Sequence, residues 1–261
     1  MTKNKKGIFH WYGYILPFEE RIKLIKQAGF DYCMLWWEDE SYPYHLNRIE
    51  LNNIITSYDL KLDNIHLPFD NINNLWCEDY MVRNKEIDVI KTWINECKNC
   101  GCDVVVMHNT QGNNHKFSYS LGYDSFNKII EEANGINIKI ALENTQMFEY
   151  TDFILKELLS PNMGFCYDSS HDFVNGGSCG EILEKWKDRL IAVHLSDNDG
   201  ICDRHWIPGK GHVDWKKIMD ILSQTNLRSY SMETYPYEEE KNLQPAEFLS
   251  RTNKALQAKI E

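Results

Sequence analysis

The sequence predicts a single (β/α)₈ barrel, or TIM barrel, that occupies residues 1–261 as one domain. Eight short apolar runs alternate with helical stretches along the whole chain. Several of these runs are apolar without interruption, as in Val104–Met107, which is typical of parallel strands buried on both faces. The length of 261 residues is close to the roughly 250 that one such barrel uses.

The predicted strands follow one another at intervals that leave room for a helix after each. They are Gly7–Trp11, Asp31–Trp37, Leu62–Leu67, Asp103–His108, Lys139–Glu143, Met163–Asp168, Leu190–Leu195 and Arg228–Glu233. The clearest helical periods cover Pro17–Ala28, Asp79–Asn99, Val213–Ser223 and Pro245–Lys259. Gly29 and Gly101 stand where helices commonly end on a glycine. A doubly wound open sheet is the alternative, but the glycine-rich phosphate loop that should follow its first strand is missing.

The composition of the chain indicates which cellular compartment and which kinds of binding partner to expect. Met1–Lys6 is basic and polar with no apolar run behind it, so we expect no secretory signal. No run approaches the roughly 18 apolar residues of a membrane span, and eight cysteines in such a chain predict reduced thiols in a cytoplasmic protein. A net charge of −11 disfavours broad affinity for nucleic acid. Homo-oligomer formation stays open.

Residues of the types that bind metal ions stand at the ends of predicted strands. Four of them end the fifth to the eighth strand: Glu143, Asp168, His194 and Glu233. Because the carboxyl ends of parallel strands meet at one mouth of a barrel, we expect these side chains to converge. Three carboxylates and one imidazole suit Mn²⁺, Mg²⁺, Co²⁺ or Zn²⁺ and leave room for a substrate oxygen. The sequence therefore predicts one divalent metal ion at this mouth.

Five further residues extend this pattern as additional metal or substrate ligands: His66, His108, His171, Asp203 and His205. His66 and His108 end the third and fourth predicted strands, and His171 follows the sixth by three residues. Asp203 and His205 are two residues apart, so they point to the same side of an extended segment.

Aromatic and basic residues complete the predicted site. Trp11, Trp36 and Trp206 fall at or near strand ends, where their rings could cover the C–H face of a sugar or equally stack a nucleobase. Arg204, between Asp203 and His205, could pair with a nearby carboxylate. We expect all four to contribute to substrate binding.

The motifs together resemble the xylose isomerase-like TIM-barrel superfamily. They are His66-Leu-Pro, Met107-His108, Ala141-Leu-Glu143-Asn144, Tyr167-Asp168-Ser-Ser-His171, Val193-His194-Leu-Ser-Asp197, Asp203-Arg-His205, Gly209-Lys-Gly211 and Met232-Glu233-Thr234. This superfamily includes sugar isomerases and epimerases and the endonuclease IV family of abasic-site nucleases (AP endonuclease family 2). The resemblance covers almost the whole chain and is more specific for the superfamily than for the reaction.

In the sugar branch, the resemblance implies that Glu143, Asp168, His194 and Glu233 hold one divalent metal ion. The two glutamates would act as acid and base on opposite faces of the sugar carbon, through an enediolate that the metal stabilises. His171 and His205 would orient hydroxyls or assist proton movement. The expected activity is that of a metal-dependent isomerase or epimerase of a sugar or keto-polyol.

In the nuclease branch, nine positions hold three zinc ions, and this chain has a ligand-type residue at all nine. That alternative is a zinc phosphodiesterase acting on abasic DNA. The loops expected at the catalytic face, however, carry fifteen Asp and Glu residues against four Lys and Arg. Such a rim repels a polyanion, so we favour a small sugar or polyol as the partner. A dehydratase or lyase on the same metal site, or a binding module, stays open.

Overall fold

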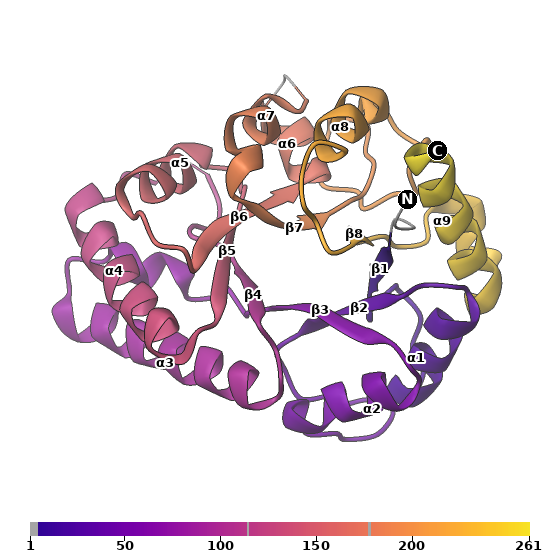
Figure 1. Ribbon diagram of the computed structural model, residues 1–261, viewed down its shortest axis with the longest axis horizontal. Coiled ribbons are helices and arrows are strands. Elements are labelled where there is room, and N and C mark those ends of the chain that lie inside the picture. Colours follow the sequence, from indigo (N-terminus) through magenta and orange to yellow (C-terminus); the bar gives the residue numbers. More distant parts are fainter. Residues whose placement is uncertain (1–4, 114, 177–178) are drawn as a thin grey trace.

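Eight parallel strands form one sheet in a computed structural model that describes residues 5–113, 115–176 and 179–261. They are β1 (Lys6–Phe9), β2 (Tyr32–Trp36), β3 (Lys61–His66), β4 (Val104–Met107), β5 (Lys139–Glu143), β6 (Met163–Asp168), β7 (Leu190–His194) and β8 (Tyr230–Met232). The order in the sheet is β7-β6-β5-β4-β3-β2-β1-β8, and a bridge between Leu195 and Met232 joins its two edges. The strands form an inner ring with the helices outside it (Figure 1), so the predicted TIM barrel is confirmed.

Nine α-helices lie in the described part of the chain. They are α1 (Phe18–Gln27), α2 (Leu51–Ser57), α3 (Tyr80–Asn99), α4 (Tyr119–Ile136), α5 (Phe148–Glu157), α6 (Ser169–Gly176), α7 (Glu181–Trp186), α8 (Trp215–Leu222) and α9 (Pro245–Ile260). The four with predicted bounds, α1, α3, α8 and α9, agree with them to within about two residues at each end. Gly29 and Gly101 have φ angles of 88° and 84°, as expected for glycines that end α1 and α3. Within the described part of the chain, no helix has the length and apolar character to cross a membrane.

Two details differ from the prediction. The strand ladder ends at Phe9 and at Trp36, so Trp11 and Trp37 belong to the loops that follow β1 and β2. Two helices, α6 and α7, follow β6 where one was expected, and α6 begins directly after the strand. The sequence predicts a loop at the catalytic face over residues 169–180, but residues 169–176 form α6.

The interior of the barrel is lined by small side chains below the mouth. Val104, Val106, Ala141, Cys166 and Ala192 form a buried cluster of their own. Four of these residues stand two positions before candidate ligands, at His108, Glu143, Asp168 and His194. Because side chains two residues apart on a strand share a face, each ligand lies one layer above a small residue and points toward the barrel axis.

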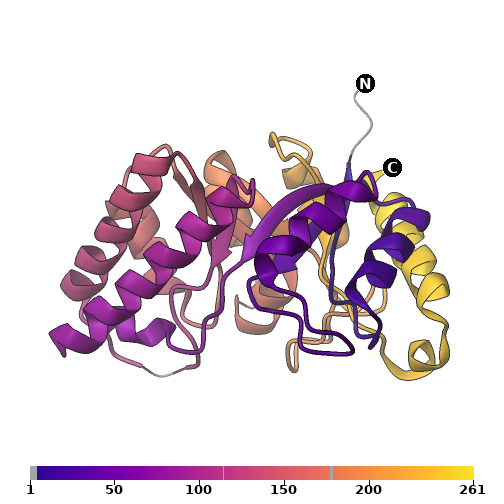
Figure 2. The same ribbon diagram turned by 90° about the horizontal axis from the view of Figure 1, so that it is seen from below.

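The loops that follow the strands gather on one side of the molecule. Figure 2 shows the long connections after β2, β7 and β8 together on the lower side of that view. This side of the molecule holds the carboxyl ends of the strands, where the candidate ligands at strand ends lie.

Candidate metal and catalytic site

The structure brings all nine predicted ligand-type residues together. Eight of them line one polar cavity of about 100 Å³: His66, His108, Glu143, His171, His194, Asp203, His205 and Glu233. The ninth, Asp168, is fully buried and has a carboxylate oxygen within 4.8 Å of donor atoms on its neighbours.

Glu143 lies at the centre of this cluster. Its Oε2 is 3.0 Å from His66 Nε2 and 3.6 Å from His108 Nε2. Its Oε1 is 3.3 Å from His194 Nδ1 and 3.4 Å from His171 Nδ1. Burial opposes ionisation, but the surrounding imidazoles, His194 foremost, hold the pKa of Glu143 well below its usual value. Glu143 is thus a carboxylate shared by imidazoles from four different segments.

The donor atoms form several overlapping groups. One group is His66, His108 and Glu143, a second is Asp168, His194 and Glu233, and a third, joined by ion pairs, is His171, Asp203 and His205. Glu143 also lies together with Cys166 and His194, and with Asp168 and His171. In the second group His194 Nδ1 lies 3.3 Å from Glu233 Oε2, the same distance that separates it from Glu143 Oε1. In the third group Asp203 Oδ2 lies 3.2 Å from His171 Nε2 and 2.9 Å from His205 Nε2.

Three of the histidines are oriented as metal ligands usually are. The Nδ1 atoms of His66, His171 and His205 lie 2.8, 2.9 and 3.2 Å from backbone carbonyl oxygens, to which they can donate. In a neutral imidazole that donates from Nδ1, Nε2 carries a lone pair, and each of these Nε2 atoms faces a carboxylate oxygen. Two facing lone pairs repel unless a proton or a metal ion lies near both. Without a metal ion a proton fills this place at His171 and His205, because the carboxylates around them raise the pKa of both imidazoles although burial opposes this. The same geometry fits metal ligation once that proton is displaced.

Asp168 provides a second indication of a cation site. Its Oδ1 accepts a hydrogen bond from His171 N at 2.7 Å, but its buried Oδ2 has no hydrogen-bond partner within the described residues. Burial, and then the Glu143 charge, raises the pKa of Asp168 to about 7, although His171 opposes this. An unsatisfied buried carboxylate oxygen is costly, and a metal ion would satisfy it. The residues present therefore fit a divalent cation with oxygen and nitrogen ligands.

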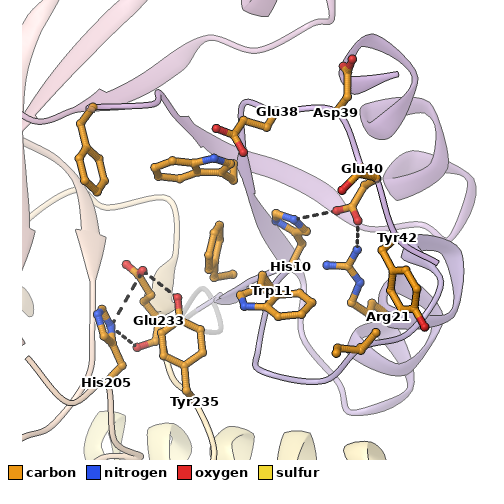
Figure 3. Close-up of a pocket in the computed structure, with 15 residues that line it drawn as sticks. His10, Trp11, Arg21, Glu38, Asp39, Glu40, Tyr42, His205, Glu233 and Tyr235 are labelled. Carbon is orange, nitrogen blue, oxygen red and sulfur yellow. Dashed lines mark hydrogen bonds and ion pairs between the residues drawn. The ribbon is translucent and has the colours of Figure 1, made fainter. Parts of the chain in front are cut away.

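A larger cavity of about 720 Å³ opens beside the cluster (Figure 3). The two cavities share five lining residues: Phe9, Trp36, Phe69, His205 and Glu233. Glu233 and His205 lie on one side of the view, with His10, Arg21 and Glu40 on the opposite side. Trp11 and Trp36, both predicted to bind substrate, line this cavity.

Arg204 and Trp206 lie apart from the cluster. Neither is among the described residues that line these two cavities. The Arg204 guanidinium forms an ion pair with Asp199 at 3.1 Å and lies over the Trp206 ring. Trp206 also packs on Tyr237, beside a separate cavity of about 160 Å³. Their roles in substrate binding stay predictions.

Two buried residues that support the site had no predicted role. The Asn144 side chain donates to Asp168 O and accepts from Asp168 N, both at 2.8 Å, so it fixes the end of β6. The Asp197 carboxylate accepts from Gly209 N at 2.7 Å and from Val213 N at 3.0 Å, and thereby closes the loop that carries Asp203 and His205. The sequence offered two signals for these residues, their position one to three residues past a strand end and their place in the motifs of the family resemblance, but neither indicated a supporting role.

This loop also needs a glycine at Gly211. A Cβ atom added there would come within 2.2 Å of Asn198 O. Only a residue without a side chain allows the backbone to approach so closely. The Gly209-Lys-Gly211 motif therefore shapes the segment next to the third donor group, while Lys210 itself pairs with Glu239 on the surface.

Fold and donor set together define a (β/α)₈ barrel with a candidate metal centre at the carboxyl ends of its strands. The chain belongs to the family described as xylose isomerase-like TIM barrel, whose profile matches residues 22–255. The predicted superfamily is therefore confirmed.

Relatives of similar sequence are distant. The chain is 24% identical over 261 residues to the uncharacterized protein y4fM of Sinorhizobium fredii, and the aligned region covers 85% of this chain and 83% of that protein. It is 23% identical over 169 residues to fructoselysine 3-epimerase of Shigella flexneri, which covers 60% of this chain and 61% of the relative.

Solved structures share the fold at low identity. A D-tagatose 3-epimerase-like protein superposes with a TM-score of 0.74 at 20% identity, covering 98% of this chain and 97% of that one. An L-ribulose 3-epimerase gives a TM-score of 0.75 at 15% identity, covering 98% and 94%. At these identities the likeness establishes the barrel and leaves the reaction to be argued from the site.

Proposed function

We propose that the protein is a divalent-metal-dependent isomerase or epimerase of a sugar or keto-polyol. The observation that carries this proposal is the placement of two glutamates around one histidine, beside a cavity large enough for a substrate. Glu143 and Glu233 both approach His194 Nδ1 to 3.3 Å, and Glu233 also lines the larger cavity. The 3-epimerases among the relatives and structural neighbours support the same reaction class.

The residues that would hold one metal ion are Glu143, Asp168, His194 and Glu233. Their carboxylate and imidazole donors suit Mn²⁺, Co²⁺, Mg²⁺ or Zn²⁺. When bound, the ion would polarise the substrate carbonyl and offset the negative charge that develops on its oxygen.

The proton would move between the substrate carbon and the two glutamates. One glutamate, as a carboxylate, removes the proton from the carbon next to the carbonyl. The other, as a carboxylic acid, gives its proton to the opposite face or to the neighbouring carbon, so the two exchange protonation states. The Tyr235 hydroxyl donates to Glu233 Oε1 at 3.4 Å and helps to orient that carboxylate. His171 and His205 would hold substrate hydroxyls, since both line the small cavity.

The test is proton exchange in heavy water. We expect the wild-type protein, loaded with each divalent metal in turn, to exchange the proton next to the carbonyl of at least one ketose or keto-inositol, followed by NMR. Because proton transfer by a positioned carboxylate contributes roughly 10²–10⁴-fold, Glu143→Gln and Glu233→Gln should each slow exchange by at least about 100-fold. Asp70→Asn is the matched control, since this exposed carboxylate lines neither cavity.

Full activity in either glutamine variant would remove that glutamate from the mechanism. If no ketose or keto-inositol exchanges with any of the metals, the proposed function itself is wrong.

A zinc phosphodiesterase acting on abasic DNA is the second candidate, and one observation favours it. The donor groups around His66 and around Asp203 lie in contact distance although a single-metal sugar site does not require them. The acidic residues around the mouth, including Glu38 and Asp39, oppose binding of a DNA backbone.

Metal content separates the two candidates. We expect about one equivalent of metal per chain by elemental mass spectrometry of natively purified, chelator-free protein, retained in His66→Ala and His108→Ala. Near three equivalents of zinc, reduced in these variants, together with cleavage of an abasic duplex, would favour the phosphodiesterase.

A further inference from the structure

We propose that the substrate is a ketose carrying a second, positively charged group, and that the 720 Å³ cavity binds this group. The inference rests on the proposed isomerase or epimerase function and names the substrate class of that site.

Cavity size is the first argument. The small cavity, about 100 Å³, is enclosed by the metal-type donors, whereas the larger one falls within the roughly 300–1,000 Å³ typical of pockets for drug-sized ligands. A hexose with its reacting carbons at Glu233 would leave most of the larger cavity to water. The shape therefore fits a sugar extended by a substituent on the side away from the donor cluster.

The far wall of the cavity is held in place without a ligand. Arg21 Nη2 pairs with Glu40 Oε2, and His10 Nε2 lies 3.3 Å from Glu40 Oε1 (Figure 3). The Arg21 side chain is only 1% exposed, and its guanidinium lies 5.2 Å from the centre of a Trp11 ring. Breaking such a buried pair is strongly unfavourable, so the wall is fixed before a ligand binds.

The charge of the lining is negative. Arg21 is the only Lys or Arg among the described residues that line the cavity, and Glu40 neutralises it. Burial lowers the pKa of His10. His205, which also lines the cavity, has its pKa raised to about 9 by Glu233 and Asp203 although burial opposes this, so its charge offsets that of Glu233.

Glu38 lines the cavity without an ion-pair partner in the described part of the chain. Asp39 accepts a hydrogen bond from Arg48 N at 2.9 Å, but the charged guanidinium of Arg48 approaches it only to 3.7 Å. A cation on the substrate would balance this charge, whereas a phosphate would be repelled.

Aromatic residues line the same space. Trp11, Trp36 and Tyr42 are among the lining residues, and Trp11 and Tyr42 are exposed. A cation is attracted to the face of an aromatic ring, most strongly to tryptophan. The aliphatic part of a substituent would also pack on these rings. An alkyl chain that ends in an ammonium group therefore matches both the apolar and the acidic parts of the lining.

The test uses D-fructose and three of its ethers with tails of similar length but different charge. The butyl, 4-aminobutyl and 3-carboxypropyl ethers are made at O1 and, in a second series, at O6. Dissociation constants are measured by calorimetry on the metal-loaded protein. In at least one series we expect the aminobutyl ether to bind at least tenfold more tightly than the butyl ether, and the carboxypropyl ether to bind most weakly.

Variants assign the preference to the cavity. Glu38→Gln should reduce the preference for the aminobutyl over the butyl ether to below threefold. Asp70→Asn, which removes a charge from the same face but outside the cavity lining, should keep the full preference.

The outcomes separate the two proposals. If D-fructose or its ethers exchange protons in heavy water but tail charge does not affect binding in either series, this inference is wrong and the proposed function stands. If neither the ethers nor any simple ketose or keto-inositol binds or exchanges, both are wrong.

Discussion

Asp63 lies in the barrel interior because β3 contains one extra residue. Cys33 pairs with Leu62 and Leu35 pairs with Ile65, so two steps along β2 correspond to three along β3. Such a bulge turns successive side chains to the same side. Both Asp63 and its neighbour Asn64 are accordingly buried, and Asp63 Oδ2 accepts a hydrogen bond from Ser231 Oγ on β8 at 2.5 Å.

This buried carboxyl makes stability depend on pH. Burial raises the pKa of Asp63 above its ordinary 3.8, so the folded chain keeps a proton that the unfolded chain loses as pH rises. The unfolded state then binds fewer protons, and the free energy of unfolding falls through this interval. Because Asp63→Asn cannot ionise, we expect the variant's free energy of unfolding, relative to wild type, to increase from pH 4 to pH 7.

Urea unfolding at both pH values measures this difference. Asp124→Asn is the control, since that side chain is half exposed and, among the described residues, forms its ion pair with Lys128 on the same helix. A relative stability of Asp63→Asn that is constant or falls with pH would contradict the argument.

At the scale of a single helix, α4 contains two glycines in opposite surroundings. A Cβ atom at Gly122 would come within 2.0 Å of the Trp76 ring, whereas one at Gly135 would meet none of the described neighbouring residues within 4 Å. Trp76 cannot easily move away, because it is buried and its Nε1 donates to Asn109 O at 2.7 Å. At Gly135, helix propensity favours alanine and packing does not oppose it. At Gly122, packing opposes the alanine that helix propensity favours.

We expect Gly135→Ala to raise the free energy of unfolding by about 0.5–1 kcal/mol, because alanine loses less backbone entropy in a helix. Gly122→Ala should lower it by about 1–3 kcal/mol, since overpacking outweighs that gain. Urea unfolding of the pair at one pH gives both values. Equal stabilisation by both substitutions would show that the contact with Trp76 is not tight.

The segment after β6 shows why one element was predicted incorrectly. The Asp172 carboxylate accepts from the Tyr167 hydroxyl at 2.8 Å and from Gly180 N at 2.6 Å. These contacts join the strand, α6 and the start of α7. Because they link residues whose spacing has no helical period, the sequence pattern indicated an open loop there.

For the whole molecule, closure of the barrel turns distant sequence positions into one site. The imidazoles around Glu143 come from the ends of β3, β4 and β7 and from α6. Their separation along the chain reaches 77 residues for His66. Parallel strands with regular helical connections put every carboxyl end at the same mouth, so the convergence of these residues could be predicted before any distance was known.

The barrel and the nine candidate ligands follow from local patterns along the chain. Strand periodicity, the ends of apolar runs and the residue types at those ends are properties of short segments, so they can be recognised one segment at a time. The order of the segments was then enough to identify the mouth.

Contacts between segments could not be predicted from these local patterns. Four features of the site depend on contacts between residues of separate elements. They are the central position of Glu143, the support of Asp168 by Asn144, the pairing of Arg21 with Glu40, and the displacement of Trp206 into another cavity. Their geometry depends on how strands and loops pack once the barrel has closed. For that reason the size and charge of the larger cavity, and the substrate class that it favours, emerged only from the folded structure.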